Sequence, residues 1–255
     1  MDPQVVPDPI SPSGVATNDL AIPREMTTDE IEHAAERFVR AARRAREAGF
    51  DGVQIHGAHG YLVTQFLSPW TNRRDDAWGG DEICRRAFLK AIVQGIRREV
   101  GADYPVWIKL GVAGRRESGL SMEEGARVAA ACVEWGIDCI EISHGLGVPE
   151  ELDETGEGRF LPMAEAVRRQ VPDGYPLAPV AGFRTRQGME RILASGVAQI
   201  ISICRPLIAE PDLPHRLREG SEALCVRCDL CRPRQAGDGV ACRNANVRHL
   251  AEKRS

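Results

Sequence analysis

The sequence predicts an α/β protein in which helices cover a parallel β-sheet. Short apolar runs alternate with amphipathic helical segments along the chain. These runs are almost continuously apolar, which is typical of strands buried in a parallel sheet. The composition, 43% hydrophobic and 27% charged, is that of an ordinary globular protein. This alternation occurs both in barrels and in doubly wound sheets. The chain length of 255 residues is close to the roughly 250 residues of a complete eight-stranded barrel.

Residues 1–26 are predicted to form an extended loop, because they show no apolar periodicity. They contain five prolines: Pro3, Pro7, Pro9, Pro12 and Pro23. The first helix is expected to begin after Thr27, which with Glu30 forms a capping-box pattern. Apolar residues then recur at helical spacing as far as Gly49.

The rest of the chain is predicted to hold five strands and the helices between them. The strand candidates are 52–56, 106–110, 139–143, 177–181 and 199–204. The helix candidates are 82–99, 122–135, 161–170 and 186–195, and Ser121 with Glu124 forms a second capping-box pattern. No strand is followed by a glycine fingerprint for dinucleotides or by a P-loop.

The charge balance excludes a general affinity for polyanions. The chain has 33 Lys and Arg against 37 Asp and Glu, a net charge of −4. No stretch reaches the roughly 20 apolar residues of a membrane span, and residues 1–4 do not resemble a secretory leader. We therefore expect a cytoplasmic protein with a small-molecule substrate and neither nucleic acid nor membrane as a partner.

Polar residues lie at the end of each predicted strand, where parallel α/β folds form their active face. They are His56, His59, Lys109, Ser143, His144, Gly182, Arg184 and Arg205. The segment from His56 to Tyr61 is the most informative. Two imidazole N–H groups can hold a carbonyl oxygen while a phenol donates a proton, which suits the reduction of a polarised double bond. A zinc site at His56 and His59 is the alternative, but no third ligand lies at a useful spacing.

Several ordered motifs resemble the old yellow enzyme family, the FMN-dependent NADH:flavin oxidoreductases and ene-reductases. These motifs are residues 23–26, 49–61, 65–69, 72–73, 78–80, 119–120, 182 and 207–213. The resemblance covers roughly residues 5 to 245. It implies a TIM-barrel fold, bound FMN and NAD(P)H as the hydride donor. By this resemblance His56 and His59 bind the activating oxygen of an enone or enoyl thioester, and Tyr61 donates the proton.

The resemblance also implies an FMN site. Lys109 would contact the pyrimidine edge of the flavin, where a cation favours the anionic reduced ring. Gly182 with Phe183, and Cys204 with Arg205, would hold the FMN phosphate through backbone N–H groups. Many relatives have glycine in place of Cys204, and the larger side chain narrows that site. From the residues alone, Arg205 could instead pair with Glu210, and His144 could be a second acid or a loop histidine.

Four clustered cysteines, Cys225, Cys228, Cys231 and Cys242, follow the last predicted helix. Their spacing suits a 4Fe-4S cluster or a structural zinc, or the cysteines could be an unoccupied relic. The pattern resembles the branch of the family that contains dienoyl-CoA reductase, where a cluster follows the barrel. The remaining cysteines are expected to be small core residues: Cys84, Cys132, Cys139 and Cys204.

By this resemblance, the five strand–helix units correspond to the fourth through eighth units of a TIM (β/α)8 barrel. The sequence thus predicts a partial barrel divided into an N-terminal loop at 1–26, an FMN-binding oxidoreductase domain at 27–220 and a Cys-rich segment at 221–255. A partial barrel has open strand edges. We therefore expect a fragment, a complementing N-terminal half-barrel chain or a homo-oligomer. The alternative function is a non-catalytic or incomplete iron–sulfur or zinc-bearing subunit of a larger flavoenzyme.

Overall fold

A parallel four-stranded sheet forms the centre of the protein. The computed structural model describes residues 8–17, 22–152, 156–233, 235 and 237–254. The strands are β3 (Val53–Gly57), β4 (Val106–Ala113), β5 (Cys139–His144) and β6 (Leu177–Pro179), and they lie side by side in chain order. All three pairings are parallel. The predicted α/β class is therefore confirmed.

The two faces of this sheet differ because alternate residues of a strand point to opposite sides. One row consists of Ile55, Ile108, Ile140 and Leu177, which are all buried in the main core. The next row consists of His56, Lys109, Glu141 and Ala178. The sheet therefore packs its aliphatic face under the helices and carries polar groups on the other face.

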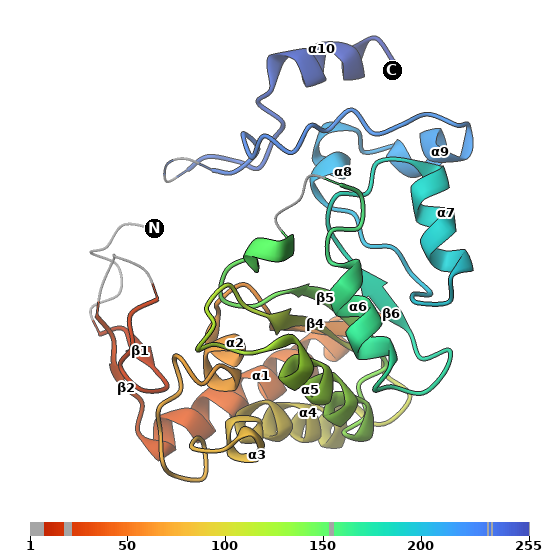
Figure 1. Ribbon diagram of the computed structural model, residues 1–255. Coiled ribbons are helices and arrows are strands. Elements are labelled where there is room, and N and C mark those ends of the chain that lie inside the picture. The colour runs from red at the N-terminus through yellow and green to blue at the C-terminus, as the bar shows by residue number, and fades with distance from the viewer. Residues whose placement is uncertain (1–7, 18–21, 153–155, 234, 236, 255) are drawn as a thin grey trace.

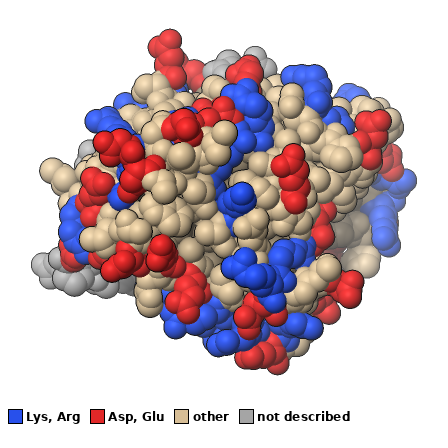
Figure 2. All heavy atoms as spheres, turned by 90° about the horizontal axis from the view of Figure 1, so that it is seen from below, with Lys and Arg blue, Asp and Glu red and all other residues tan. Residues whose placement is uncertain are grey.

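Helices that precede and follow the strands pack against the aliphatic face. They are α1 (Thr28–Glu47), α4 (Ala87–Val100), α5 (Met122–Glu134) and α6 (Leu161–Arg168). Figure 1 shows α1, α4 and α5 together below the strands. Seen from below, basic and acidic side chains are interspersed over the surface (Figure 2). Ion pairs such as Arg43 with Glu99, at 3.6 Å, contribute to this mixed surface.

The capping box predicted for α1 is confirmed. Thr27 Oγ1 accepts the Glu30 N–H at 3.3 Å, and Glu30 Oε2 accepts the Thr27 N–H at 2.9 Å. Within the predicted N-terminal loop, the described residues include two short parallel strands, β1 (Ile10–Ser11) and β2 (Arg24–Glu25). Arg74 donates to the carbonyls of Pro12 and Met26, so this segment is attached to the domain.

The second predicted capping box forms only in part. Ser121 accepts the Glu124 N–H at 3.2 Å, but the Glu124 carboxylate accepts from Arg85 at 2.6 Å. The helix predicted over 82–99 is divided at Arg86 into α3 (Glu82–Arg85) and α4. A short helix after β3, α2 (Leu62–Leu67), was not predicted.

The fifth predicted strand, 199–204, is wrong in extent, because only a single parallel bridge joins Val180 to Ser202. Pro179 has no N–H to donate to a neighbouring strand, which shortens the ladder. The N–H groups of Gln199 and Ile200 both point to the carbonyl of Leu177 at 3.2 Å. The helices on either side are α7 (Arg186–Ala194) and α8 (Arg205–Ala209).

The chain continues through α9 (Leu213–Arg218) into the Cys-rich segment and ends in α10 (Ala245–Glu252), which lies above α8 in Figure 1. A short 3-10 helix, Glu150–Leu152, follows β5 earlier in the chain. Among the described residues, no helix has the length and apolar character needed to cross a membrane.

The four scattered cysteines divide into two groups. Cys132 and Cys139 are buried, as predicted. The prediction was wrong for the other two, because Cys84 is half-buried and Cys204 is exposed. Cys204 lies at the start of α8, where the chain leaves the sheet and its side chain has no core to enter.

Candidate functional site

His56, Lys109 and Glu141 form a polar row on the face of the sheet opposite the aliphatic core. Lys109 Nζ lies 2.5 Å from Glu141 Oε1, and Gln54 Nε2 donates to Glu141 Oε2 at 2.8 Å. Sequence reasoning missed Gln54 and Glu141, although each lies two residues before a predicted polar site and therefore on the same face as that site. Glu141 holds the Lys109 ammonium in the middle of this face.

His59 joins the loop after β3 to the end of β5. Its backbone is left-handed, with φ at 61°, and its N–H donates to the carbonyl of His144 at 3.0 Å. Its Nε2 lies 2.8 Å from Ser143 Oγ. The His59 ring centroid is 5.1 Å from that of His56 and 4.7 Å from that of His144. Three imidazoles therefore gather at the ends of two neighbouring strands.

These imidazoles are neutral at pH 7. Burial, together with the nearby His144, His56 and Lys109, lowers the pKa of His59 to about 4. Burial is also the main reason that the pKa values of His56 and His144 are lowered. A neutral imidazole can donate one N–H to an oxygen atom, but it is a poor acid. A proton donor in this site must come from another group.

Tyr61 is the nearest hydroxyl of suitable chemistry. Its ring centroid lies 4.8 Å from that of His56, and 59% of the residue is exposed. Tyr61 is the N-cap residue of α2, and Gln65 from the first turn of this helix donates to the carbonyl of Gly60 at 2.8 Å. The sequence-predicted residues His56, His59, Tyr61 and Lys109 thus lie close together, on neighbouring positions of β3 and β4 and in the loop after β3.

The other predicted residues lie where β6 and the bridge at Ser202 end. Gly182 has φ at +87°, and a Cβ there would lie 2.5 Å from the carbonyl oxygen of Gly156, so only glycine fits. Phe183 is 2% exposed. Four backbone N–H groups donate no hydrogen bond to any described residue: those of Gly182, Phe183, Cys204 and Arg205. Gly182 is half-buried and Phe183 is buried, so the unpaired N–H groups of this turn suit an anionic ligand.

A neighbouring set of donors is already occupied. Glu157 accepts the N–H groups of Arg184 and Thr185 at 2.5 and 2.6 Å, and the Thr185 hydroxyl at 2.8 Å. No sequence signal identified Glu157, because it comes from a different loop. The Arg205 guanidinium lies 2.5 Å from Asp229, so the predicted alternative partner Glu210 is wrong. Glu210 instead accepts the Leu224 N–H at 2.6 Å.

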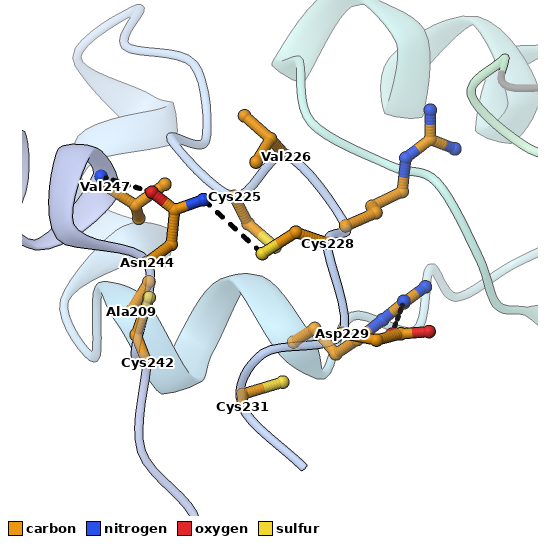
Figure 3. Close-up of a pocket in the computed structure, with 11 residues that line it drawn as sticks. Ala209, Cys225, Val226, Cys228, Asp229, Cys231, Cys242, Asn244 and Val247 are labelled. Atoms are coloured by element: carbon orange, nitrogen blue, oxygen red, sulfur yellow. Dashed lines mark hydrogen bonds and ion pairs between the residues drawn. The ribbon is translucent and has the colours of Figure 1, made fainter.

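The four clustered cysteines line one small pocket with Ala209, Asn244 and Val247 (Figure 3). Asn244 Nδ2 donates to Cys228 Sγ at 3.4 Å, and this bond is the main reason that the pKa of Cys228 is lowered. Burial raises the pKa of Cys225. Within the described ranges, no three His, Cys, Asp or Glu side chains are placed to hold a single metal ion.

Comparison with known proteins identifies the family. The model of the NADH:flavin oxidoreductase / NADH oxidase family matches residues 1–223. The chain belongs to this family. The family predicted from the sequence motifs is thereby confirmed, and its members are FMN- and NADH-dependent oxidoreductases.

Similar proteins include two bacterial enzymes. The chain is 36% identical to the NADH oxidase of Thermoanaerobacter brockii, covering 88% of this chain and 35% of that protein. It is 34% identical to the NADPH dehydrogenase of Geobacillus thermodenitrificans, covering 81% of this chain and 59% of that protein. The chain therefore spans between about a third and three-fifths of the length of these relatives.

Solved structures of similar fold include 2-naphthoyl-CoA reductase, with a TM-score of 0.77, 31% identity and coverage of 86% of this chain and 34% of that chain. Histamine dehydrogenase from Rhizobium sp. 4-9 gives a TM-score of 0.71 with 28% identity, covering 83% of this chain and 32% of that chain. The parallel α/β fold of this chain is thus shared with both structures.

Proposed function

We propose that this chain carries the substrate and FMN sites of an ene-reductase, which reduces enones or enoyl thioesters with hydride from NAD(P)H. The observation that carries the proposal is the grouping of His56, His59 and Tyr61 beside Lys109 at the ends of parallel strands. Bound FMN supplies hydride chemistry to such a site. Because the chain spans only part of the length of its relatives, the activity of the complete enzyme is also a proposal.

Each side chain has a role that follows from its protonation state. His56 and His59, being neutral, donate N–H groups to the substrate carbonyl oxygen and stabilise the negative charge that develops there. Tyr61, exposed beside His56, donates its hydroxyl proton to the carbon next to that carbonyl. His144 is a further candidate acid, but its lowered pKa makes it a weaker choice at neutral pH.

The residues of the proposed FMN site fit the group chemically. The unpaired N–H groups of Gly182, Phe183, Cys204 and Arg205 are suitable donors for its phosphate. Lys109 would hold the pyrimidine edge, with Glu141 positioning the ammonium.

Turnover tests the proposal. The FMN-loaded protein should oxidise NADH or NADPH under anaerobic conditions only when a cyclic enone or an enoyl thioester is added. The saturated product should form in equal amount. FMN-loaded protein that leaves every such alkene unreduced, while another flavoenzyme reduces them in the same buffer, would contradict an ene-reductase.

We further propose that the sheet is part of a TIM barrel, with the described strands and the Ser202 bridge matching its fourth through eighth strands. Two features support this arrangement: among the described residues β3 is an edge strand of the sheet, and the face opposite the aliphatic core carries a polar row. The remaining strands would come from a complementing chain, a longer form of the protein or a second copy. In this arrangement 1–26 is a lead-in, 27–220 the barrel domain and 221–255 the Cys-rich segment.

A second candidate function is a cluster-bearing subunit of a larger flavoenzyme that is not catalytic by itself. The four cysteines around one pocket favour it. A zinc ion needs its sulfur ligands about 2.3 Å from one centre, whereas the four thiolates of a 4Fe-4S cluster bind different irons. The four thiols around this pocket are suitable ligands for either group. Iron and acid-labile sulfide without flavin binding would favour this candidate, and zinc alone would exclude the cluster.

A further inference from the structure

We propose that Arg227, which lies between the first two cysteines of the Cys-rich segment, binds the phosphate of FMN. This inference rests on the proposed FMN site and adds a side chain from outside the barrel domain to it. It also gives the Cys-rich segment a direct part in flavin binding, in addition to any metal that its thiols hold.

The position of Arg227 supports this role. A Cβ built on Gly182 would lie 3.2 Å from Arg227 Nη1. The same nitrogen lies 3.4 Å from the carbonyl oxygen of Gly156, which is a long hydrogen bond. The guanidinium therefore lies beside the turn whose N–H groups, at Gly182 and Phe183, have no partner among the described residues.

The backbone of the segment gives an independent argument. Arg227 and Asp229, on either side of Cys228, have φ at 57° and 58°, in the left-handed region that non-glycine residues seldom adopt. With this backbone, three cysteines line the pocket while the two intervening charged residues reach the two strand ends. Asp229 contacts Arg205 at one strand end, and Arg227 lies beside Gly182 at the other.

The chemistry of a phosphate monoester explains why a second cation is useful. The group carries nearly two negative charges at pH 7, and a guanidinium can bind two of its oxygens at once. Arg205 already shares its charge with Asp229. Arg227 places a guanidinium on the side of Gly182, where the absence of a side chain lets Arg227 Nη1 and the carbonyl oxygen of Gly156 lie close to the backbone.

The comparison of FMN with riboflavin, which lacks the phosphate, isolates this contact. We expect Arg227→Gln to weaken FMN binding by about 10- to 100-fold, the range for a hydrogen bond to a charged group. Riboflavin binding should stay within about twofold of the unaltered protein. The experiment uses the full chain as purified, without adding or removing metal. Both affinities are measured by flavin fluorescence titration at one ionic strength.

Two further variants make the test specific. Arg248→Gln removes the same charge from an arginine on α10 whose side chain is 62% exposed, and it should leave both affinities unchanged. Arg227→Lys keeps the charge but loses the planar fork, and it should weaken FMN binding by a smaller factor without affecting riboflavin. It also serves if Arg227→Gln fails to fold.

Equal weakening of FMN and riboflavin by both Arg227 variants would overturn the inference, because the residue would then act only on the fold. Unchanged FMN binding in both variants would overturn it as well. If the unaltered chain binds riboflavin and FMN equally well, the phosphate has no site and the inference fails while flavin binding stands. If it binds neither flavin, the proposed FMN site fails and the inference fails with it.

Discussion

His59 Nε2 lies 2.8 Å from Ser143 Oγ, so that the loop after β3 is held against the end of β5. This contact, with the His59 N–H bonded to the carbonyl of His144, places the imidazole in its left-handed turn. Burial among other basic groups lowers the pKa of His59 to about 4. An ordinary histidine in an unfolded chain has a pKa of about 6.5.

This difference predicts a pH dependence of stability. Between about pH 6.5 and pH 4 the unfolded chain binds a proton at His59 that the folded chain does not bind, so the free energy of unfolding falls as the pH falls through this range. Above pH 6.5 His59 is unprotonated in both states, so the free energy of unfolding no longer changes with pH through this residue. In His59→Gln this part of the slope should be lost. His59 is exposed to solvent as a whole residue, which limits the size of the effect.

Urea unfolding at four pH values from 4 to 7 measures this slope, with the unaltered protein as the reference. His56 and His144 are present in both proteins, so their own contributions cancel in the comparison. Parallel curves for the two proteins would show that His59 titrates normally in the folded state.

Tyr61→Phe should retain FMN and lower turnover by about 100-fold or more, the contribution expected of a general acid. The ring packing against His56 is kept and only the hydroxyl is lost. Tyr104→Phe is the matched control, because its hydroxyl donates to the carbonyl of Phe50, away from this site. Turnover should be measured at saturating NADH and alkene. Equal rates for Tyr61→Phe and the unaltered enzyme would remove Tyr61 from its proposed role.

The Arg85–Glu124 ion pair should contribute to stability through burial. Its atoms are 2.6 Å apart and the side chains are 11% and 12% exposed. Arg85→Met leaves a buried carboxylate without its partner, which should lower the free energy of unfolding by about 3 kcal/mol. Adding Glu124→Gln removes that buried charge and should recover part of the loss.

Arg127→Met is the control for this pair. Arg127 bonds to Glu82 at 2.8 Å, but its side chain is 49% exposed, so the loss should stay below about 1 kcal/mol. Denaturant unfolding of the four proteins gives the comparison. Similar losses in the Arg85 and Arg127 variants would mean that the first pair is solvated.

Gly182→Ala should prevent FMN binding and destabilise the fold by about 1–3 kcal/mol. The added Cβ would have to displace the carbonyl of Gly156 and adopt φ near +87°. Gly174→Ala separates the two causes, because its φ of +74° is similar but nothing lies within 4 Å of the added atom. Thermal unfolding and FMN titration are measured for both variants. Equal effects at the two glycines would mean that the positive φ alone, and not the clash with Gly156, causes the loss.

The sequence predicted the order of strands and helices because each element contains a clear pattern of apolar residues. It also predicted polar groups at His56 and His144, which lie at the ends of β3 and β5, but it expected Lys109 at a strand end and this residue lies within β4. The weak fifth strand could not be foreseen, because the shortening depends on Pro179 facing that neighbour. Glu141 was hidden within a strand, and the contacts of Glu157 and Arg227 depend on how distant loops pack.

Equilibrium titration of the purified chain with FMN tests the central claim most directly. We predict saturable binding of one FMN per chain with quenched flavin fluorescence, and weaker binding in Lys109→Met, whose altered residue lies in the polar row beside His56. If the folded chain shows no saturable binding, alone or after mixing with the N-terminal half of the barrel from a relative, the assignment of an FMN site to these strand ends is contradicted.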